Sequence, residues 1–204
     1  GNGSMQAIMS GERADGVVVC EGTSDELILA HMGFVFFRVK FTGKSCHSGA
    51  KKEGVSAIDK AIKVIQALNE KEHEWLLHYK HPLLPAPNLN VGVIHGGTAG
   101  STVADECMFE VCVHYLPNQM SHNQVVKEFR EVVERVARSD AWLEEHLPEV
   151  SIYQSGGGFE MEEDAPFVNS FKRAYSEARG KKVKVVGSPA GCDSRLWKNI
   201  AECP

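Results

Sequence analysis

Two polar side chains are of a type and in a position that could serve metal binding or catalysis, and the first is Glu21. It ends the apolar run "DGVVVCEG" and precedes Gly22. We read this run as a buried strand, and ligand sites collect at the carboxyl ends of such strands. A carboxylate beside a glycine, where the backbone can turn sharply, can bind a metal ion. The alternative is that Glu21 caps a helix or forms an ion pair.

The second side chain is His47, in the turn "GKSCHSGAKKEG". A histidine among small residues can donate a hydrogen bond to an oxygen that gains negative charge during a reaction. The alternative is a surface histidine bonded to nearby backbone. His114 lies on an expected strand, where a structural role is the simpler reading. Cys192 adjoins Asp193, but that segment holds no histidine to activate the thiol, so a nucleophilic cysteine is disfavoured.

Composition narrows the class of protein. The chain has 204 residues, 43% of them apolar, and a net charge of −5. An acidic chain with no basic run disfavours a nucleic-acid partner and leaves a small molecule or another protein. The sequence shows no apolar membrane span and no secretory leader, so we expect no membrane partner and a cytoplasmic location. Six cysteines without a CxxC pair are expected to be reduced and mostly buried.

The elements that must position these residues follow from hydrophobic periodicity. Alternation predicts a strand in "GFVFFRVKFTG", and three- and four-residue steps predict a helix over 56–78. The segments "LNVGVIHGG" and "CMFEVCVHYLP" are predicted as a strand pair. The loop between them, "GGTAGSTVAD", lacks the lysine and the helix of a phosphate loop. A helix capped by Ser121 and a strand in "EVSIYQSGGG" follow. This order, βαββαβ, predicts a ferredoxin-like unit.

The flanks predict a second, interrupted domain. We assign residues 33–155 to the ferredoxin-like domain, and 1–32 and 156–204 to two parts of an α/β domain, with glycines 156–158 as the return linker. The second flank contains a predicted helix in "APFVNSFKRAYSEARG" and a strand and turn in "KVKVVGSPAGCDSRLW". The final "NIAECP" reads as the start of another strand. Because so few elements make a poor parallel sheet, we expect the chain to be a fragment of a longer protein.

Four motifs occur together in a familiar order: "GNGS", Glu21-Gly22-Thr23, the turn and helix start from Gly43 to Ile58, and "GCDSR". With them the sequence resembles the zinc metallopeptidase and deacylase family of acetylornithine deacetylase, succinyl-diaminopimelate desuccinylase, aminoacylase and carboxypeptidase G. The resemblance implies a catalytic α/β domain into which a ferredoxin-like dimerisation domain is inserted. The expected function is hydrolysis of an N-acyl amino acid by a metal-activated water, closest to acetylornithine deacetylase.

The resemblance also implies roles for single residues. Glu21 would bind one of two zinc ions, with cobalt or manganese as alternatives. His47 would reach across a homodimer and stabilise the oxyanion of the partner's substrate when the inserted domain closes over it. The other metal ligands of the family have no counterpart in residues 1–204. The chain alone is therefore expected to be inactive.

Substrate recognition is where the sequence departs from the family pattern. In the family pattern an asparagine occupies the position of Ser101, and an arginine that binds the substrate carboxylate occupies the position of His114. Cys192, Asp193 and Arg195 match the Thr/Ser-Asp-x-Arg turn of the family's substrate pocket. An equally weighted alternative is that this turn is structural and held by a salt bridge. A dipeptidase or an N-carbamoyl amino-acid hydrolase therefore remains an alternative within the family. A non-catalytic module for dimerisation or ligand binding is the alternative from another class.

Overall fold

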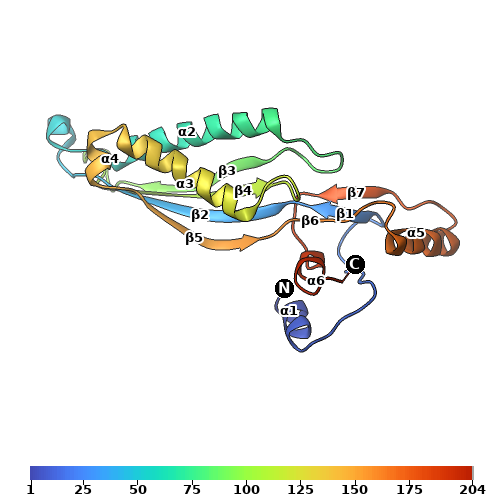
Figure 1. Ribbon diagram of the computed structural model, residues 1–204. Coiled ribbons are helices and arrows are strands. Elements are labelled where there is room, and N and C mark those ends of the chain that lie inside the picture. The colour runs from blue at the N-terminus through green and yellow to red at the C-terminus, as the bar shows by residue number, and fades with distance from the viewer. Residues whose placement is uncertain (204) are drawn as a thin grey trace.

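The computed structural model describes residues 1–203, and its larger part is built on an antiparallel sheet of four strands (Figure 1). The strand order is β3-β4-β2-β5. In chain order the strands are β2 (Gly33–Thr42), β3 (Asn88–Gly96), β4 (Glu106–Tyr115) and β5 (Glu149–Gly156). Alternate residues of β2 and β4 are buried, as the period of a strand requires.

Two long helices cover one face of this sheet (Figure 1). They are α2 (Ala57–His78) and α3 (His122–Arg138), and the short α4 (Ala141–Glu145) follows. Ser56 and Ser121 cap the two long helices, each accepting from a backbone N–H at 3.1 Å. The core between helices and sheet contains aromatic side chains, and the rings of Phe37 and Phe129 stack with centroids 3.8 Å apart. The predicted ferredoxin-like βαββαβ unit is confirmed, and we use that name for β2 through β5 with their helices.

A second, three-stranded sheet has the order β6-β1-β7. Here β1 (Leu27–His31) runs parallel to β7 (Val185–Ser188) and antiparallel to β6 (Phe159–Glu160). The helices of this part are α1 (Asn2–Met9), α5 (Pro166–Arg179) and α6 (Ser194–Asn199). The mixed α/β class is confirmed. We keep the domain limits 1–32, 33–155 and 156–204 as a proposal that the two separate sheets support.

Three expectations from the sequence are wrong. Residues 17–23 form no strand; the strand here is β1, which begins six positions after Glu21. The segment 27–31 forms the strand because it pairs with β6 on one side and with β7 on the other. Val18, in the segment that we expected to be buried, is 54% exposed. Residues 200–203 form no strand either, because Ala201 and Cys203 pack against α1. All six cysteines are free, as expected, but only Cys107 and Cys203 are buried.

The junction between the two sheets is tightly packed. A Cβ atom on Gly33 would lie 2.2 Å from the Tyr115 ring, so only glycine fits at the start of β2. The His81 ring bonds Glu160 at 2.9 Å, and Asn118 donates to the same carboxylate at 2.8 Å. Since Glu160 belongs to β6, these contacts join the ferredoxin-like unit to the three-stranded sheet.

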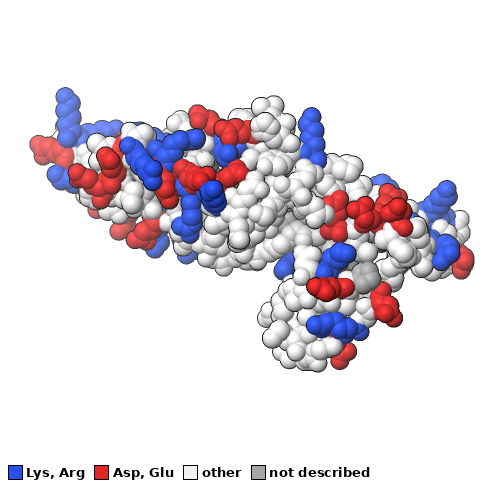
Figure 2. Space-filling view, viewed as in Figure 1, with Lys and Arg blue, Asp and Glu red and all other residues white. Residues whose placement is uncertain are grey.

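The surface carries both basic and acidic side chains. Figure 2 shows basic and acidic side chains interspersed over the visible face of the ferredoxin-like unit. None of the helices formed by the described residues has the length and apolar character needed to cross a bilayer.

Candidate functional site

His47 occupies the turn between β2 and α2. It is exposed and caps the 3-10 helix η1 (Ser48–Glu53), where its Nδ1 accepts a hydrogen bond from the Gly49 N–H at 3.1 Å. A neutral imidazole that accepts at Nδ1 carries its proton on Nε2. His47 therefore presents an N–H donor through Nε2, which is the group an oxyanion needs.

Ser101 lies beside this turn. Its carbonyl accepts from the Ser48 N–H at 2.8 Å, and His47 pairs with Thr102 as an isolated β-bridge. The glycine-rich loop between β3 and β4 therefore fixes the backbone on which His47 stands. Ser101 contacts the His47 turn through its backbone carbonyl, and the expected contact of its side chain with substrate stays a prediction.

Glu21 lies at the other end of the molecule, exposed on an irregular segment. It lines a pocket of about 240 Å³ beside β1 and α5. Cys192 lines the same pocket, together with apolar side chains such as Phe167 and Trp197. The structure thus brings together two of the predicted site residues that are far apart in the sequence.

The turn from Gly191 to Arg195 contains three predicted residues in three different settings. The Cys192 thiol donates to the Ser194 hydroxyl at 3.2 Å. Asp193 accepts a hydrogen bond from the Ser4 hydroxyl of α1 at 2.7 Å. The Arg195 guanidinium lies over the Phe34 ring, 5.9 Å from its centroid, and donates to no hydrogen-bond acceptor among residues 1–203.

His114 lies on β4, directly opposite Phe34 across the β2–β4 ladder, on the sheet face away from the helices. The ring is half-buried, and its Nδ1 is 3.7 Å from the Cys112 sulfur. Burial lowers the pKa of His114 below its ordinary value of 6.5, so the ring is mainly neutral at pH 7. Phe34 therefore brings Arg195 and a neutral histidine together at the junction of the two sheets.

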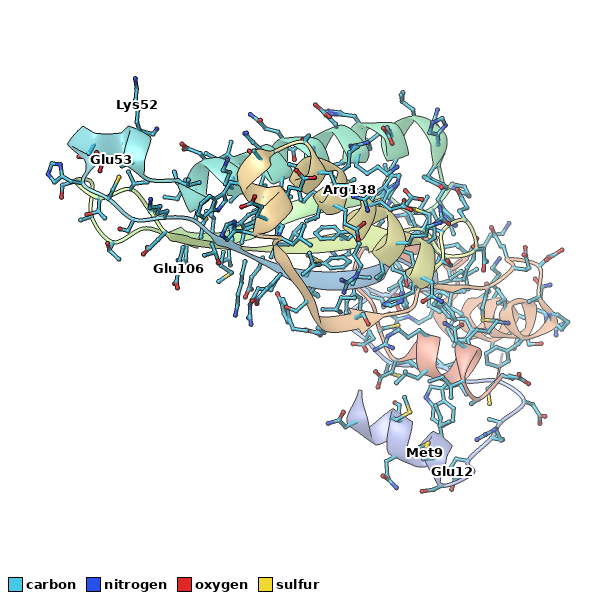
Figure 3. The ribbon with its side chains drawn as sticks, turned by 60° about the vertical axis from the view of Figure 1, so that its left-hand side comes forward. Met9, Glu12, Lys52, Glu53, Glu106 and Arg138 are labelled. Atoms are coloured by element: carbon cyan, nitrogen blue, oxygen red, sulfur yellow. The ribbon has the colours of Figure 1, made fainter. Side chains whose placement is uncertain are left out.

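The predicted residues fall into two separate groups. Lys52 and Glu53, which belong to the η1 turn capped by His47, lie at one end of the molecule in Figure 3. Met9 and Glu12, beside the α1–α6 cluster, lie at the other end. Within one chain His47 therefore cannot reach a ligand held at the Glu21 pocket.

The residues do not by themselves fit a two-metal centre. Within residues 1–203, no three histidine, cysteine, aspartate or glutamate side chains lie close enough to hold a metal ion. Glu21 belongs to no such group of three among residues 1–203, and one carboxylate is a weak ligand set.

Sequence reasoning missed His31, a fully buried side chain at the end of β1. The signal was available, because the apolar run "LILA" ends in this histidine and a glycine follows two residues later. We applied the rule about strand ends to "DGVVVCEG" instead. The contact of Arg195 with Phe34, 161 positions apart in sequence, had no local signal.

Fold and site together define a mixed α/β chain that carries a ferredoxin-like unit. The sequence pattern described as the peptidase dimerisation domain matches residues 29–141, more than half of the chain. The chain belongs to the M20 family of metallopeptidases and deacylases, as the motif order predicted.

Curated relatives agree with this assignment, and a solved structure shares the fold. The chain is 32% identical over 174 residues to the N-formyl-4-amino-5-aminomethyl-2-methylpyrimidine deformylase of Bacillus subtilis, a match covering 79% of this chain and 39% of the relative. It is 29% identical over 158 residues to the acetylornithine deacetylase of Vibrio parahaemolyticus, covering 76% and 41%. The aminopeptidase PepT of Bacillus cereus superposes with a TM-score of 0.74 at 24% identity, covering 97% of this chain and 50% of that structure. The chain thus spans about two fifths of these curated relatives.

Proposed function

We propose that the chain belongs to a zinc-dependent amidohydrolase that removes the acyl group from an N-acyl amino acid. The observation that carries the proposal is the hydrogen bond at His47 Nδ1, which leaves Nε2–H as an exposed donor in a chain of this family. The named relatives remove formyl or acetyl groups, which are joined to nitrogen by amide bonds. Hydrolysis of such a bond places negative charge on the carbonyl oxygen, and a preorganised N–H stabilises it.

Three further site residues, Glu21, Arg195 and Cys192, have a defined part in this proposal. Glu21 is one ligand of the metal, and zinc is the ion we propose, with cobalt or manganese as substitutes. Arg195 binds the substrate carboxylate, because its guanidinium has no acceptor within residues 1–203 and can bind a carboxylate with two parallel hydrogen bonds. Cys192 lines the acyl pocket beside Glu21. Completing the metal centre takes ligands beyond the side chains that residues 1–203 bring together.

We propose a homodimer as the working form. The edge strand β3 and the neighbouring α2 carry exposed apolar side chains: Ile94 is 49% exposed, Ile62 44% and Leu77 77%. Pairing two β3 edges would cover unpaired backbone groups and these side chains together. Ile94→Lys should shift sedimentation toward monomer, whereas Ile152→Lys on the opposite edge strand β5 should not. A cytoplasmic location stays a prediction.

A second candidate is removal of a formyl group from an aromatic aminomethyl compound, as the name of the Bacillus relative describes. A specific observation favours it: His114 is half-buried and neutral where the family pattern has an arginine for a carboxylate. A neutral histidine opposite Phe34 suits an uncharged aromatic ring better than an anion.

A substrate panel separates the candidates. The natural gene product that contains this sequence would be purified, loaded with zinc and offered N-acetyl and N-succinyl amino acids, N-carbamoyl amino acids, dipeptides and N-formyl aromatic amines. Release of acid from N-acyl amino acids would support the first candidate, and release of formate alone would support the second. Hydrolysis of only the carbamoyl compounds or dipeptides would select those family alternatives. Bound zinc without hydrolysis of any compound would favour the non-catalytic module.

A further inference from the structure

The chain crosses between the two sheets at two places that lie side by side. One is residues 32–33, between β1 and β2, and the other is the glycine run 156–158, between β5 and β6. Phe34 and Gly156, next to these crossings, are paired in the β2–β5 ladder. In the sheet order β3-β4-β2-β5, both crossings therefore belong to the same half of the sheet. Two adjacent connections form a hinge, and they do not by themselves fix the angle between the two parts.

The other half of the sheet is held by a carboxylate. Glu160 of β6 accepts from His81 Nε2 at 2.9 Å and from the Asn118 amide at 2.8 Å, with one bond at each carboxylate oxygen. His81 precedes β3 and Asn118 follows β4, so both donors come from loops at that half. The two loops are also bonded to each other, because Gln119 donates to the Lys80 carbonyl at 2.8 Å. We call Glu160, His81 and Asn118 the Glu160 clasp.

The backbone orients the histidine of the clasp. His81 Nδ1 accepts from the Leu83 and Leu84 N–H groups at 3.0 and 3.1 Å. A neutral ring that accepts at Nδ1 carries its proton on Nε2, the atom that faces Glu160. The His81 side chain is only 2% exposed, so its bond to the carboxylate forms away from bulk water, where a hydrogen bond is stronger.

The angle at the hinge decides where His47 lies. The ten residues of β2 span about 33 Å at about 3.3 Å a residue, and His47 lies beyond the far end of this strand. A rotation of about 10° at the hinge would therefore move the His47 turn by about 6 Å. An oxyanion donor acts only within about 3 Å of the oxygen. The proposed reaction thus needs a hinge angle that is held within a few degrees.

We propose that Glu160 is a positioning residue: the clasp fixes the angle of the ferredoxin-like unit against the three-stranded sheet and so places His47 for the partner's site. The inference rests on the proposed function of His47 and adds a residue to it. Glu160 touches no reacting atom. It sets an orientation at one end of β2, and His47 depends on that orientation at the other end.

Two replacements of Glu160 separate the clasp from the packing around it. Glu160→Ala removes both bonds, and the fold should survive because the apolar cluster around Leu84 still joins the two parts. Glu160→Gln can keep both bonds, because its amide oxygen accepts from His81 and its NH2 group donates to Asn118 once the Asn118 amide turns over. Glu162→Ala removes an exposed carboxylate two residues away and is the matched control.

Turnover is measured in the zinc-loaded natural gene product, in the wild-type background and in the His47→Ala background. We expect Glu160→Ala to lower kcat about tenfold in the first background, since a small misplacement of a catalytic group suffices for such a loss, and to cause no further loss in the second. Glu160→Gln and Glu162→Ala should keep nearly wild-type kcat. An equal loss in both backgrounds would overturn the positioning role, because it would show general damage to the protein.

A second measurement needs no activity. Spin labels on genetically encoded, non-cysteine side chains at Lys52 and Glu12, which lie at opposite ends of the molecule (Figure 3), report the hinge angle as a distance. Labelled protein is diluted with an excess of unlabelled protein, so that only distances within one chain are measured. We expect Glu160→Ala to broaden the distance distribution by about 6 Å, the displacement that a rotation of about 10° produces. Glu160→Gln and Glu162→Ala should leave the distribution unchanged.

These outcomes keep the two proposals apart. If wild type hydrolyses no compound of the panel, the proposed function fails and the distance distributions alone decide the role of Glu160. An unchanged distribution in Glu160→Ala would overturn that role, and so would equal broadening in the Glu162→Ala control. Should Glu160→Ala fail to fold, Asn118→Ala replaces it, because it removes one of the two bonds at an exposed side chain. A broader distribution in Asn118→Ala would then support the clasp, and an unchanged one would overturn it.

Discussion

Two histidines of this chain hold opposite tautomers, and the backbone assigns them. At His47 the Gly49 N–H donates to Nδ1, which leaves the proton on Nε2. At His31 the Nδ1–H donates to the Met32 carbonyl, which keeps the proton of the neutral ring on Nδ1. The exposed ring can therefore stabilise developing negative charge through Nε2–H, whereas the buried ring uses its N–H to bond its own backbone. One local hydrogen bond decides the chemistry in each case.

If His47 stabilises the oxyanion, its replacement should lower turnover and leave zinc binding unchanged. In the zinc-loaded natural gene product, His47→Ala should lower kcat about a hundredfold, the usual effect of removing one oxyanion donor. The bound zinc, measured by atomic absorption, should not change, because His47 is proposed as a hydrogen-bond donor and not as a metal ligand. His73→Ala, an exposed histidine on α2, is the matched control and should keep wild-type turnover. Normal kcat in His47→Ala would contradict the assignment.

His114 predicts how substrate affinity depends on pH. Its pKa lies below 6.5 because of burial, so the ring carries a charge only in more acidic solution. If His114 contacts a substrate carboxylate, KM for an N-acyl amino acid should fall as the pH falls through that lowered pKa and should rise again toward pH 7. KM for an uncharged N-formyl aromatic amine should not follow this curve. His114→Asn should remove the pH dependence, and a persisting curve would assign it to another group.

At the scale of elements, α4 is tied to α2 through one carboxylate. Asp140 caps α4 by accepting from the Trp142 and Leu143 N–H groups at 3.1 and 3.2 Å. Lys60 and Lys63 of α2 donate to the same carboxylate at 2.7 and 2.6 Å, and its side chain is only 4% exposed. Burial by itself would raise the pKa of Asp140, but the two lysines and the Leu143 N–H outweigh it and hold the pKa well below its ordinary range.

This arrangement predicts a graded loss of stability. Asp140→Asn keeps a capping oxygen but removes the charge, and should lower the free energy of unfolding by about 2 kcal/mol at pH 7. Asp140→Ala also loses the cap and should lower it by about 1 kcal/mol more. Since the folded pKa lies below the unfolded one, the advantage of wild type over Asp140→Asn should persist above about pH 4 and shrink as the pH falls further. Urea unfolding of the three proteins at pH 7 and pH 3 measures both effects. A stability difference between wild type and Asp140→Asn that is as large at pH 3 as at pH 7 would show that it does not come from the carboxylate charge.

The sequence could predict those features that arise within one helix, strand or turn, and it could not predict those that arise from contacts between distant segments. Periodicity and the capping Ser121 sufficed for the ferredoxin-like unit, because the buried faces of β2, β4 and the helices repeat within each element. The strand β1 was missed because its partners, β6 and β7, follow it by more than a hundred residues. The turn at His47 was predictable from its small residues. The meeting of Arg195 with Phe34, and of Glu21 with Cys192 at one pocket, arises only from the tertiary fold.

At the scale of the whole molecule, the distance between the two site groups is the main constraint. The turn that follows His47 lies at one end of the molecule, and the elements that line the Glu21 pocket, among them β1 and α5, lie at the other end (Figure 1). Between them the junction is closely packed, since a Cβ atom on Gly187 would lie 2.3 Å from the Leu83 carbonyl oxygen. Bending at such a junction would not bring the two groups together. If both serve one reaction, they must come from two copies of the chain.

This geometry predicts complementation between inactive variants. The proteins His47→Ala and Glu21→Ala would each be nearly inactive as homodimers, because every site lacks one group. After dissociation in mild denaturant and reassociation of an equal mixture, half of the dimers are mixed, and each mixed dimer has one site with both groups intact. About a quarter of wild-type activity should therefore return, as two-fold symmetry requires. Light scattering would confirm that the recovered species is a dimer. A mixture that stays inactive, although mixed dimers are shown by mass-tagged subunits, would place His47 outside the partner's site.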